Sequence, residues 1–194
     1  MARWDPGSRG RLHEAALELF AERGFEHTTV AEIARRAGVT ERTYFRHFSD
    51  KREVLFAAGA ALEEALVRAV AEAPASLSPL DAVAAGLEAI AAALPDRETA
   101  RRRQAIIAGH PGLLERDLMK NASRSAALAE ALRGRGLREP AAAVTAEVGI
   151  AVFRIASERW MDDANDRGLT ELIHEYLDEL RTVGSERPGA AKAR

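Results

Sequence analysis

The chain has 194 residues and a net charge of −2; 47% of its residues are apolar but only 5% are aromatic, which favours an Ala- and Leu-rich helical protein. The absence of cysteine excludes a disulfide framework and a thiolate metal site. Because no apolar run approaches the roughly 18 residues of a membrane span and no secretory signal is visible, we expect a cytoplasmic protein.

The N-terminal segment predicts one amphipathic helix after a short arm. Residues 1–7 are expected to form a flexible arm. Ser8 can cap a helix, and Gly24 can end it. Between them, apolar residues recur at helical spacing: Leu12, Ala15, Ala16, Leu19 and Phe20. We therefore expect a helix over residues 8–23.

The next stretch predicts a second helix and a tight turn. Thr29 can cap a helix over about 29–37, because its hydroxyl can accept a hydrogen bond from an otherwise unpaired backbone N–H. Val30, Ile33, Ala34 and Ala37 then form one apolar face. Gly38 is placed to end this helix in the left-handed conformation.

A third helix is predicted over about 40–47, with Thr40 as its cap. It is expected to bury Phe48, and also Phe45, and to direct four polar side chains mostly outwards: Arg42, Thr43, Arg46 and His47. A helix, a glycine turn and a second capped helix form a helix-turn-helix, whose second helix enters the major groove of DNA.

Positive charge is concentrated in the same segment. Residues 35–52 carry six basic and two acidic side chains, a local charge of +4 in a chain whose total is negative. The basic residues are Arg35, Arg36, Arg42, Arg46, Lys51 and Arg52. Such a local concentration favours a DNA-binding surface. The net charge of −2 disfavours an architectural protein that coats nucleic acid, because that class is strongly basic overall.

A resemblance to a known family is carried by the stretch GFEHTTVAEIARRAGVTERTYFRHFSDKREVLF. It resembles the N-terminal signature of the TetR/AcrR family of bacterial transcriptional regulators, from about Arg11 to about Phe56. The resemblance implies an all-α fold of about nine helices. A helix-turn-helix DNA-binding domain would cover residues 1–51, a ligand-binding and dimerisation domain residues 52–183, and a flexible tail residues 184–194.

Six further helices are predicted after the helix-turn-helix, separated by proline- and glycine-containing breaks. The first, which Ser49 or Asp50 can cap, is predicted to run without a break to Glu72 over about 33 Å. The next begins at Pro79 behind the cap Ser78. The predicted ranges are about 51–72, 79–94, 96–109, 112–133, 140–163 and 169–183. In the helix over 112–133 the residues expected to point inwards are Leu114, Leu118, Ala122 and Leu132.

The helix over residues 140–163 is apolar almost all round, which is typical of a helix covered on every side. In a domain this small, a second subunit is expected to cover one side. Together with residues 169–183 this helix predicts a four-helix bundle across a two-fold axis, an arrangement that the family resemblance also implies. The alternative is that this helix is only the core of a monomer.

Eight residues are expected to contact DNA: Thr29, Thr40, Arg42, Thr43, Tyr44, Arg46, His47 and Lys51. Arg42 is the first candidate for a base contact, because a guanidinium can bond a guanine edge through two hydrogen bonds. The resemblance implies that Lys51 holds a phosphate. It also shows one departure, because many members carry a phosphate-binding tyrosine where this chain has Phe45. Which of Tyr44 and Phe45 faces DNA stays open, and the alternative for the arginines is a solvated surface with Tyr44 in the core.

The resemblance also implies an effector pocket among the helices that follow the DNA-binding domain. Polar residues near apolar stretches are the candidates for its lining: Gln104, His110, Met119, Asn121, Arg154 and Glu158. For each of them the alternative is a surface or interface position. The aliphatic helical stripes suggest a hydrophobic small molecule as effector. No cofactor is expected, and the histidine spacing predicts no metal site.

These features predict a sequence-specific DNA-binding transcriptional regulator, namely a homodimeric repressor that a small-molecule ligand releases from a palindromic operator. An activator of the same fold remains an alternative. So does a helical protein that binds or converts a small molecule, although the chain contains no Walker loop, GxGxxG, GxSxG or HExxH motif.

Overall fold

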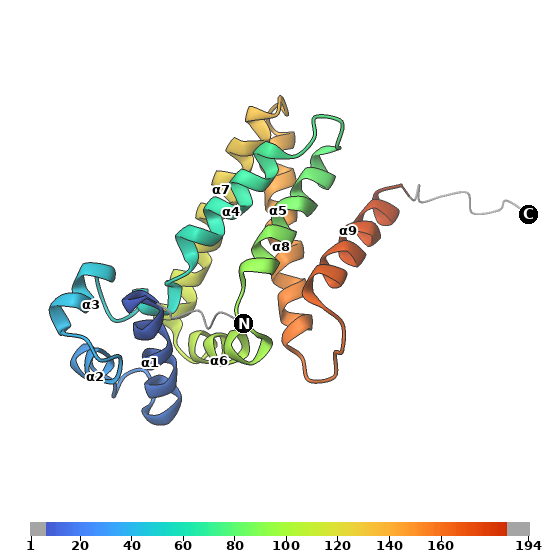
Figure 1. The fold of residues 1–194 in the computed structure, drawn as a ribbon. Coiled ribbons are helices and arrows are strands. Elements are labelled where there is room, and N and C mark those ends of the chain that lie inside the picture. Colours follow the sequence, from blue (N-terminus) through green and yellow to red (C-terminus); the bar gives the residue numbers. More distant parts are fainter. Residues whose placement is uncertain (1–6, 186–194) are drawn as a thin grey trace, which may run out of the picture. The chain divides into compact units, whose positions relative to one another are not determined.

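The structure is a computed structural model that describes residues 7–185, and within them the chain forms nine α-helices, one 3₁₀ helix and no strand (Figure 1). The all-α prediction is therefore confirmed. The predicted arm, apart from Gly7, and the tail beyond Ser185 lie outside the described residues. The elements are α1 Ser8–Arg23, α2 Val30–Arg36, α3 Glu41–His47, η1 Glu53–Phe56, α4 Gly59–Glu72, α5 Pro79–Ala93, α6 Arg97–Ala108, α7 Pro111–Gly134, α8 Ala141–Met161 and α9 Leu169–Ser185.

The helices form two compact units. Unit 1 consists of the chain up to Ala61 together with Pro95–Lys120, and unit 2 of Leu62–Leu94 together with the chain from Asn121 onwards. The predicted division between residues 51 and 52 differs from this grouping. The reason is that apolar side chains from η1, α6 and α7 are buried in the same core as α1, α2 and α3: Val54, Leu55, Phe56, Ile107 and Leu113.

The start of α1 corrects one detail. The helix begins at Ser8, and its N-cap residue is Gly7, which makes no side-chain cap. The Ser8 hydroxyl instead forms a hydrogen bond of 2.7 Å with Nε2 of His47. The predicted extent of the helix, residues 8–23, is confirmed.

The long helix predicted from residue 51 to Glu72 is wrong, because a 3₁₀ helix precedes α4. The Asp50 carboxylate accepts hydrogen bonds from the backbone N–H groups of Arg52 and Glu53, at 2.7 and 3.1 Å, and so starts a tight turn. The carbonyl of Val54 then bonds the His13 ring at 2.7 Å. The carbonyl of Leu55 likewise accepts from the Arg103 guanidinium at 2.7 Å. These side chains form hydrogen bonds with carbonyls that in a continuous α-helix would accept the N–H group four residues later.

The inward face predicted for α7 is also wrong. Leu113, Leu128 and Leu132 are buried, whereas Leu114 and Leu118 are 42% and 59% exposed. Ala122 is exposed too, so only Leu132 of the four predicted residues points inwards. In the part of α7 that belongs to unit 1, three charged side chains turn towards η1 and α6 and form ion pairs there: Arg116, Asp117 and Lys120.

In unit 2, α5 packs against α4, α8 and α9, and two glycines allow close approach to the first two of these helices. A Cβ atom on Gly86 of α5 would lie 2.7 Å from Cγ2 of Val70 on α4. A Cβ atom on Gly149 of α8 would lie 2.6 Å from Cγ1 of Val83 on α5. Neither position has room for a methyl group, so the backbone at each glycine packs directly against a side chain of the neighbouring helix. None of the helices between residues 7 and 185 is both long and apolar enough to span a membrane.

Candidate nucleic-acid interface

The turn between α2 and α3 is built by local capping, as predicted. The Thr29 hydroxyl accepts a hydrogen bond from the Glu32 N–H at 3.3 Å, and the Glu32 carboxylate accepts one from the Thr29 N–H at 2.9 Å. This reciprocal capping box satisfies two backbone donors, and the bonds from Thr29 lower the pKa of Glu32. Gly38 has φ +68°, which only glycine adopts without strain.

Helix α3 has one buried and one exposed face. Thr40 caps it by accepting a hydrogen bond from the Thr43 N–H at 3.2 Å. Tyr44 and Phe48 are buried on the inner face, at 0% and 3% exposure. Phe48 therefore lies where it was predicted, whereas Phe45 does not. Its ring is 54% exposed, because only one of two adjacent aromatic residues can point into the core.

The position of Tyr44 corrects its expected role. Its side chain is fully buried, and its hydroxyl donates a hydrogen bond of 3.2 Å to the carbonyl of Asp50. Burial, together with the negative charges of Asp50 and Glu53, raises the pKa of Tyr44. The hydroxyl thus ties α3 to the segment that follows it and is not available to a phosphate.

The basic residues of this segment differ in what they contact. Arg36 forms ion pairs with Glu18 and Glu22, each at 2.9 Å. Arg42 and Arg46 are exposed and have no hydrogen bond or ion pair with any of residues 7–185. They stand one helical turn apart on α3, so both can face the same ligand. The local positive charge is therefore available mainly on α3.

Lys51 and His47 make contacts within unit 1. The Lys51 ammonium donates to the carbonyl of Phe25 at 2.7 Å and lies 4.2 Å from the centroid of the Phe25 ring. His47 is half-buried, and its pKa is lowered by burial and by the charges of Arg46 and Arg9, which keeps the ring neutral near pH 7.

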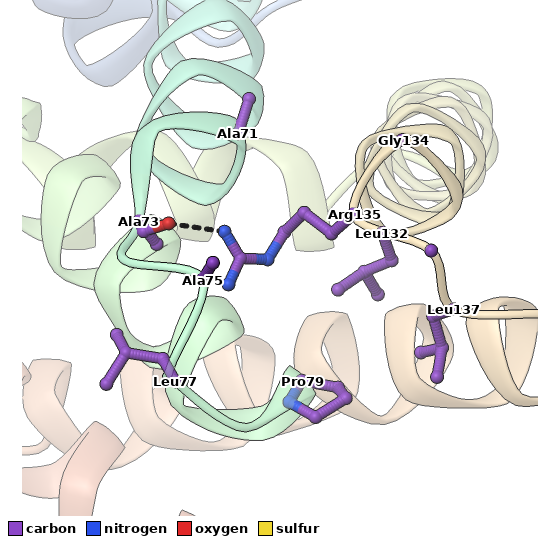
Figure 2. Close-up of a pocket in the computed structure, with 10 residues that line it drawn as sticks. Ala71, Ala73, Ala75, Leu77, Pro79, Leu132, Gly134, Arg135 and Leu137 are labelled. Atoms are coloured by element: carbon purple, nitrogen blue, oxygen red, sulfur yellow. Dashed lines mark hydrogen bonds between the residues drawn. The ribbon is translucent and has the colours of Figure 1, made fainter.

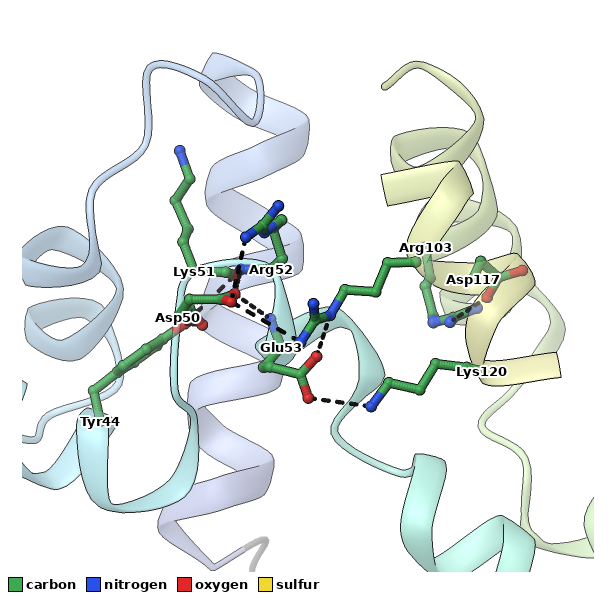
Figure 3. Close-up of polar contacts among 9 residues, drawn as sticks. Tyr44, Asp50, Lys51, Arg52, Glu53, Arg103, Asp117 and Lys120 are labelled. Atoms are coloured by element: carbon green, nitrogen blue, oxygen red, sulfur yellow. Dashed lines mark hydrogen bonds and ion pairs between the residues drawn. The ribbon is translucent and has the colours of Figure 1, made fainter. Parts of the chain in front are cut away.

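The segment after α3 is held by a group of ion pairs that the sequence does not reveal (Figure 3). The Glu53 carboxylate forms ion pairs with Arg116 and with Lys120, the latter at 3.3 Å. Arg116 also lies 4.0 Å from the Asp50 carboxylate. The backbone carbonyl of the same residue accepts the hydrogen bond from the Tyr44 hydroxyl. Glu53 and Arg116 are 63 residues apart, so no local pattern could have paired them. These contacts fix the exit of α3 against α7 within unit 1.

The predicted effector-site residues are divided between the two units. Gln104, His110 and Met119 belong to unit 1, and the other three to unit 2. Arg154 pairs with Glu158 at 2.9 Å, and both side chains are about half exposed, so neither interrupts a buried face of α8. Within residues 7–185, no group of three His, Asp or Glu side chains could hold a metal ion.

A hollow of about 530 Å³ lies in unit 2, lined largely by aliphatic side chains (Figure 2). The lining residues come from the end of α4, the loop before α5 with the first residue of α5, and the end of α7 with the start of the α7–α8 connection. The Arg135 guanidinium donates hydrogen bonds to three carbonyls there, those of Val70, Ala73 and Pro74. None of the six predicted effector-site residues lines this hollow.

Two family profiles match the chain. Residues 12–58 match the profile described as "Bacterial regulatory proteins, tetR family", which includes most of α1 and all of α2, α3 and η1. Residues 77–184 match the profile described as "MftR C-terminal domain", which is more than half of the chain.

Individual relatives agree with these profiles. The HTH-type transcriptional regulator TcmR of Streptomyces glaucescens is 31% identical over 94% of this chain and 88% of its own length. The structure of Thermus thermophilus FadR, a TetR family repressor in complex with lauroyl-CoA, is 26% identical, with a TM-score of 0.51 over 96% of this chain and 100% of that one. The structure of SmeT, the repressor of the Stenotrophomonas maltophilia efflux pump SmeDEF, is 22% identical, with a TM-score of 0.60 over 95% and 96%.

Proposed function

This chain belongs to the TetR family of bacterial regulatory proteins, and on that premise we propose that it is a homodimeric repressor that a small-molecule ligand releases from a palindromic operator. As a member of the family it is a DNA-binding transcriptional regulator and not an enzyme. The observation that carries the proposal is the exposed face of α3, where Arg42 and Arg46 stand without partners among residues 7–185.

In this proposal α3 is the recognition helix. Arg42 lies in its first turn and donates to a guanine edge, while Arg46, one turn later, contacts a phosphate. Thr43 is half-buried and lies beside Arg42, where its side chain can reach a base edge. The DNA backbone is contacted by four residues around this face: Thr29, Thr40, His47 and Lys51. Tyr44 is left out of the DNA contacts because it is buried.

Dimerisation is supported by apolar surface on the last two helices. Along α8, four residues at helical spacing remain exposed or half-buried: Val144, Val148, Ala151 and Ile155. On α9, which packs against α8, Leu180 and Val183 are 37% and 63% exposed. Covering these stripes with those of a second copy would bury them around a two-fold axis. Two recognition helices would then read the two halves of a palindrome.

Repression and ligand release are supported by the relatives. Two of the structural neighbours are described as repressors, and one of these is bound to lauroyl-CoA, a molecule with a long apolar chain. We place the effector of this protein in the same broad class, a small molecule with an apolar body that binds unit 2. The aliphatic core of that unit is consistent with such a ligand.

The test is DNA binding by the full chain, measured by fluorescence anisotropy at two salt concentrations and followed by footprinting on the DNA upstream of its own gene. The expected result is a protected inverted repeat whose affinity falls steeply with salt, because bound cations are released from phosphates. Binding without preference over bulk DNA, there and in a genome-wide pull-down, would contradict the proposal and favour an architectural role.

A further inference from the structure

An aromatic ring stands exposed on the proposed recognition helix between two arginines. Phe45 is 54% exposed and is the only aromatic residue among the large exposed apolar side chains of the described chain. Arg42 precedes it by three residues, and Arg46 follows it directly. Arg42 lies three residues before Phe45 and four before Arg46, and residues at these two spacings are neighbours on a helix surface. DNA bound by Arg42 and Arg46 would therefore also meet the ring.

The ring of Phe45 is supported from beneath by the core of unit 1. It meets the Tyr44 ring edge-on, with centroids 5.5 Å apart and an interplanar angle of 78°. Tyr44 is fully buried and held by its hydrogen bond to the Asp50 carbonyl. Because its support is fixed, the Phe45 ring needs to lose little conformational freedom when it binds a ligand.

The chemistry of the ring limits what it can contact on DNA. Phenylalanine has no hydrogen-bond donor or acceptor, so Phe45 can bond neither a phosphate nor the polar edge of a base. The major groove offers an apolar group that varies with sequence, the 5-methyl group of thymine. We propose that Phe45 packs on a thymine methyl group in each operator half-site and so determines part of the sequence specificity. This inference rests on the function proposed above.

The spacing along α3 predicts where that thymine lies. Three residues separate Arg42 from Phe45, which is about 4.5 Å along a helix axis. Successive bases on one strand are about 3.4 Å apart. The thymine is therefore expected within one or two base pairs of the base that Arg42 contacts, and each half of the operator contains one.

The experiment replaces single thymines of the footprinted operator with deoxyuridine, which removes only the methyl group. Affinities are measured by fluorescence anisotropy for the unmodified protein and for Phe45→Ala. For the unmodified protein, one replacement in each half-site is expected to weaken binding about fourfold, the value of one buried methyl group. Phe45→Ala is expected to bind the thymine and uracil operators equally.

Three controls separate this reading from simpler effects. Phe45→Tyr keeps the ring and is expected to keep the preference for thymine. Leu118→Ala truncates a side chain that is 59% exposed on α7, and it is expected to leave both affinities unchanged. Thermal unfolding of each variant checks that the fold is intact, which is expected because both positions are exposed.

The outcomes distinguish this inference from the proposed function. If the unmodified protein binds no operator selectively, the proposed function fails. If it binds selectively but every uracil operator binds as tightly as the thymine operator, only the reading by Phe45 is overturned. The same holds if Phe45→Ala loses affinity but keeps the full uracil effect, because the ring would then contact the sugar–phosphate backbone.

Discussion

At the scale of single residues, Arg42 and Lys51 are both basic, but they differ in what holds them. Arg42 is exposed and unpartnered within residues 7–185, whereas Lys51 donates to the Phe25 carbonyl at 2.7 Å. A free guanidinium on α3 suits a base edge, and an ammonium at the start of the next segment suits a phosphate. The two residues should therefore affect DNA binding in different ways.

We expect Arg42→Ala to cost about 1–3 kcal/mol on the operator and to relax the preference at one base pair. Lys51→Ala should weaken all sequences alike and reduce the salt slope by about 1. Affinities for the operator and for single-base variants, measured over a range of salt, test both. Arg36→Ala is a control, because Arg36 is held by Glu18 and Glu22. Equal salt slopes and base preferences in the two test variants would overturn these roles.

His13 links pH to stability in unit 1. Its ring bonds the Val54 carbonyl at 2.7 Å, and burial is the main reason that its pKa is lowered from 6.5. Between that lowered pKa and 6.5 the unfolded chain binds more protons than the folded one, so stability falls as the pH drops below about 6.5.

His13→Gln keeps a donor for the Val54 carbonyl but removes the titration. We expect the loss of stability between pH 7.5 and pH 5.5, measured by urea unfolding, to be smaller in this variant than in the unmodified protein. His27→Gln is the control for replacing an exposed histidine by glutamine. If His13→Gln loses as much stability on acidification as the unmodified protein, His13 is not the linked group.

At the scale of elements, the fold was predictable from the sequence where the determining contacts are local. Thr29, Thr40 and Ser78 cap helices as predicted, because each hydroxyl bonds a backbone N–H three residues later. Gly38 likewise ends α2 through its own backbone conformation. These features depend only on a few adjacent residues, which a pattern of residue types can represent.

The predictions that failed concern positions whose structure depends on contacts outside the local sequence pattern. The segment over η1 is held by His13 and Arg103, which are 41 and 48 residues away from the carbonyls they bond. Packing also decides between the adjacent rings: Tyr44 points inwards, and its hydroxyl donates to the Asp50 carbonyl six residues later. Helical periodicity cannot include such partners, so the break before α4 and the exposed ring emerge only from the structure.

The ion pairs between η1 and α7 should stabilise unit 1. Glu53 is 20% exposed and pairs with Arg116, which is 30% exposed, so solvent screens the pair only in part. We expect Arg116→Met to lower the free energy of unfolding by about 1 kcal/mol and to speed amide hydrogen exchange over residues 50–56. Urea unfolding and hydrogen exchange measure these two effects.

The matched control for this pair is Arg68→Met. Arg68 pairs with Glu64 on α4 at 3.7 Å, but both side chains are more than half exposed. This substitution should change stability by less than about 0.5 kcal/mol and leave exchange over residues 50–56 unchanged. If the two variants behave alike, the contacts of Arg116 do not hold the exit of α3.

At the scale of the whole molecule, the proposed function makes DNA affinity depend on assembly into a dimer. The proposed recognition helix α3 has seven residues and would make few contacts, whereas a second copy would convert binding to the next half-site into a linked event. The exposed apolar stripes of α8 and α9 are the surface proposed to join the copies. A charge placed on that surface should therefore weaken DNA binding even though no DNA contact is changed.

Ile155 is 46% exposed on the α8 stripe, and burying a carboxylate there in a dimer would be unfavourable. We expect Ile155→Glu to sediment as a monomer at micromolar concentration and to bind the palindrome at least about 100-fold more weakly. Its affinity for an isolated half-site should stay the same, because unit 1 is unaltered. Leu118→Glu, which places the same charge on an exposed leucine of α7, should remain dimeric. A monomeric unmodified protein, or an Ile155→Glu variant that remains dimeric, would show that this surface does not join the subunits.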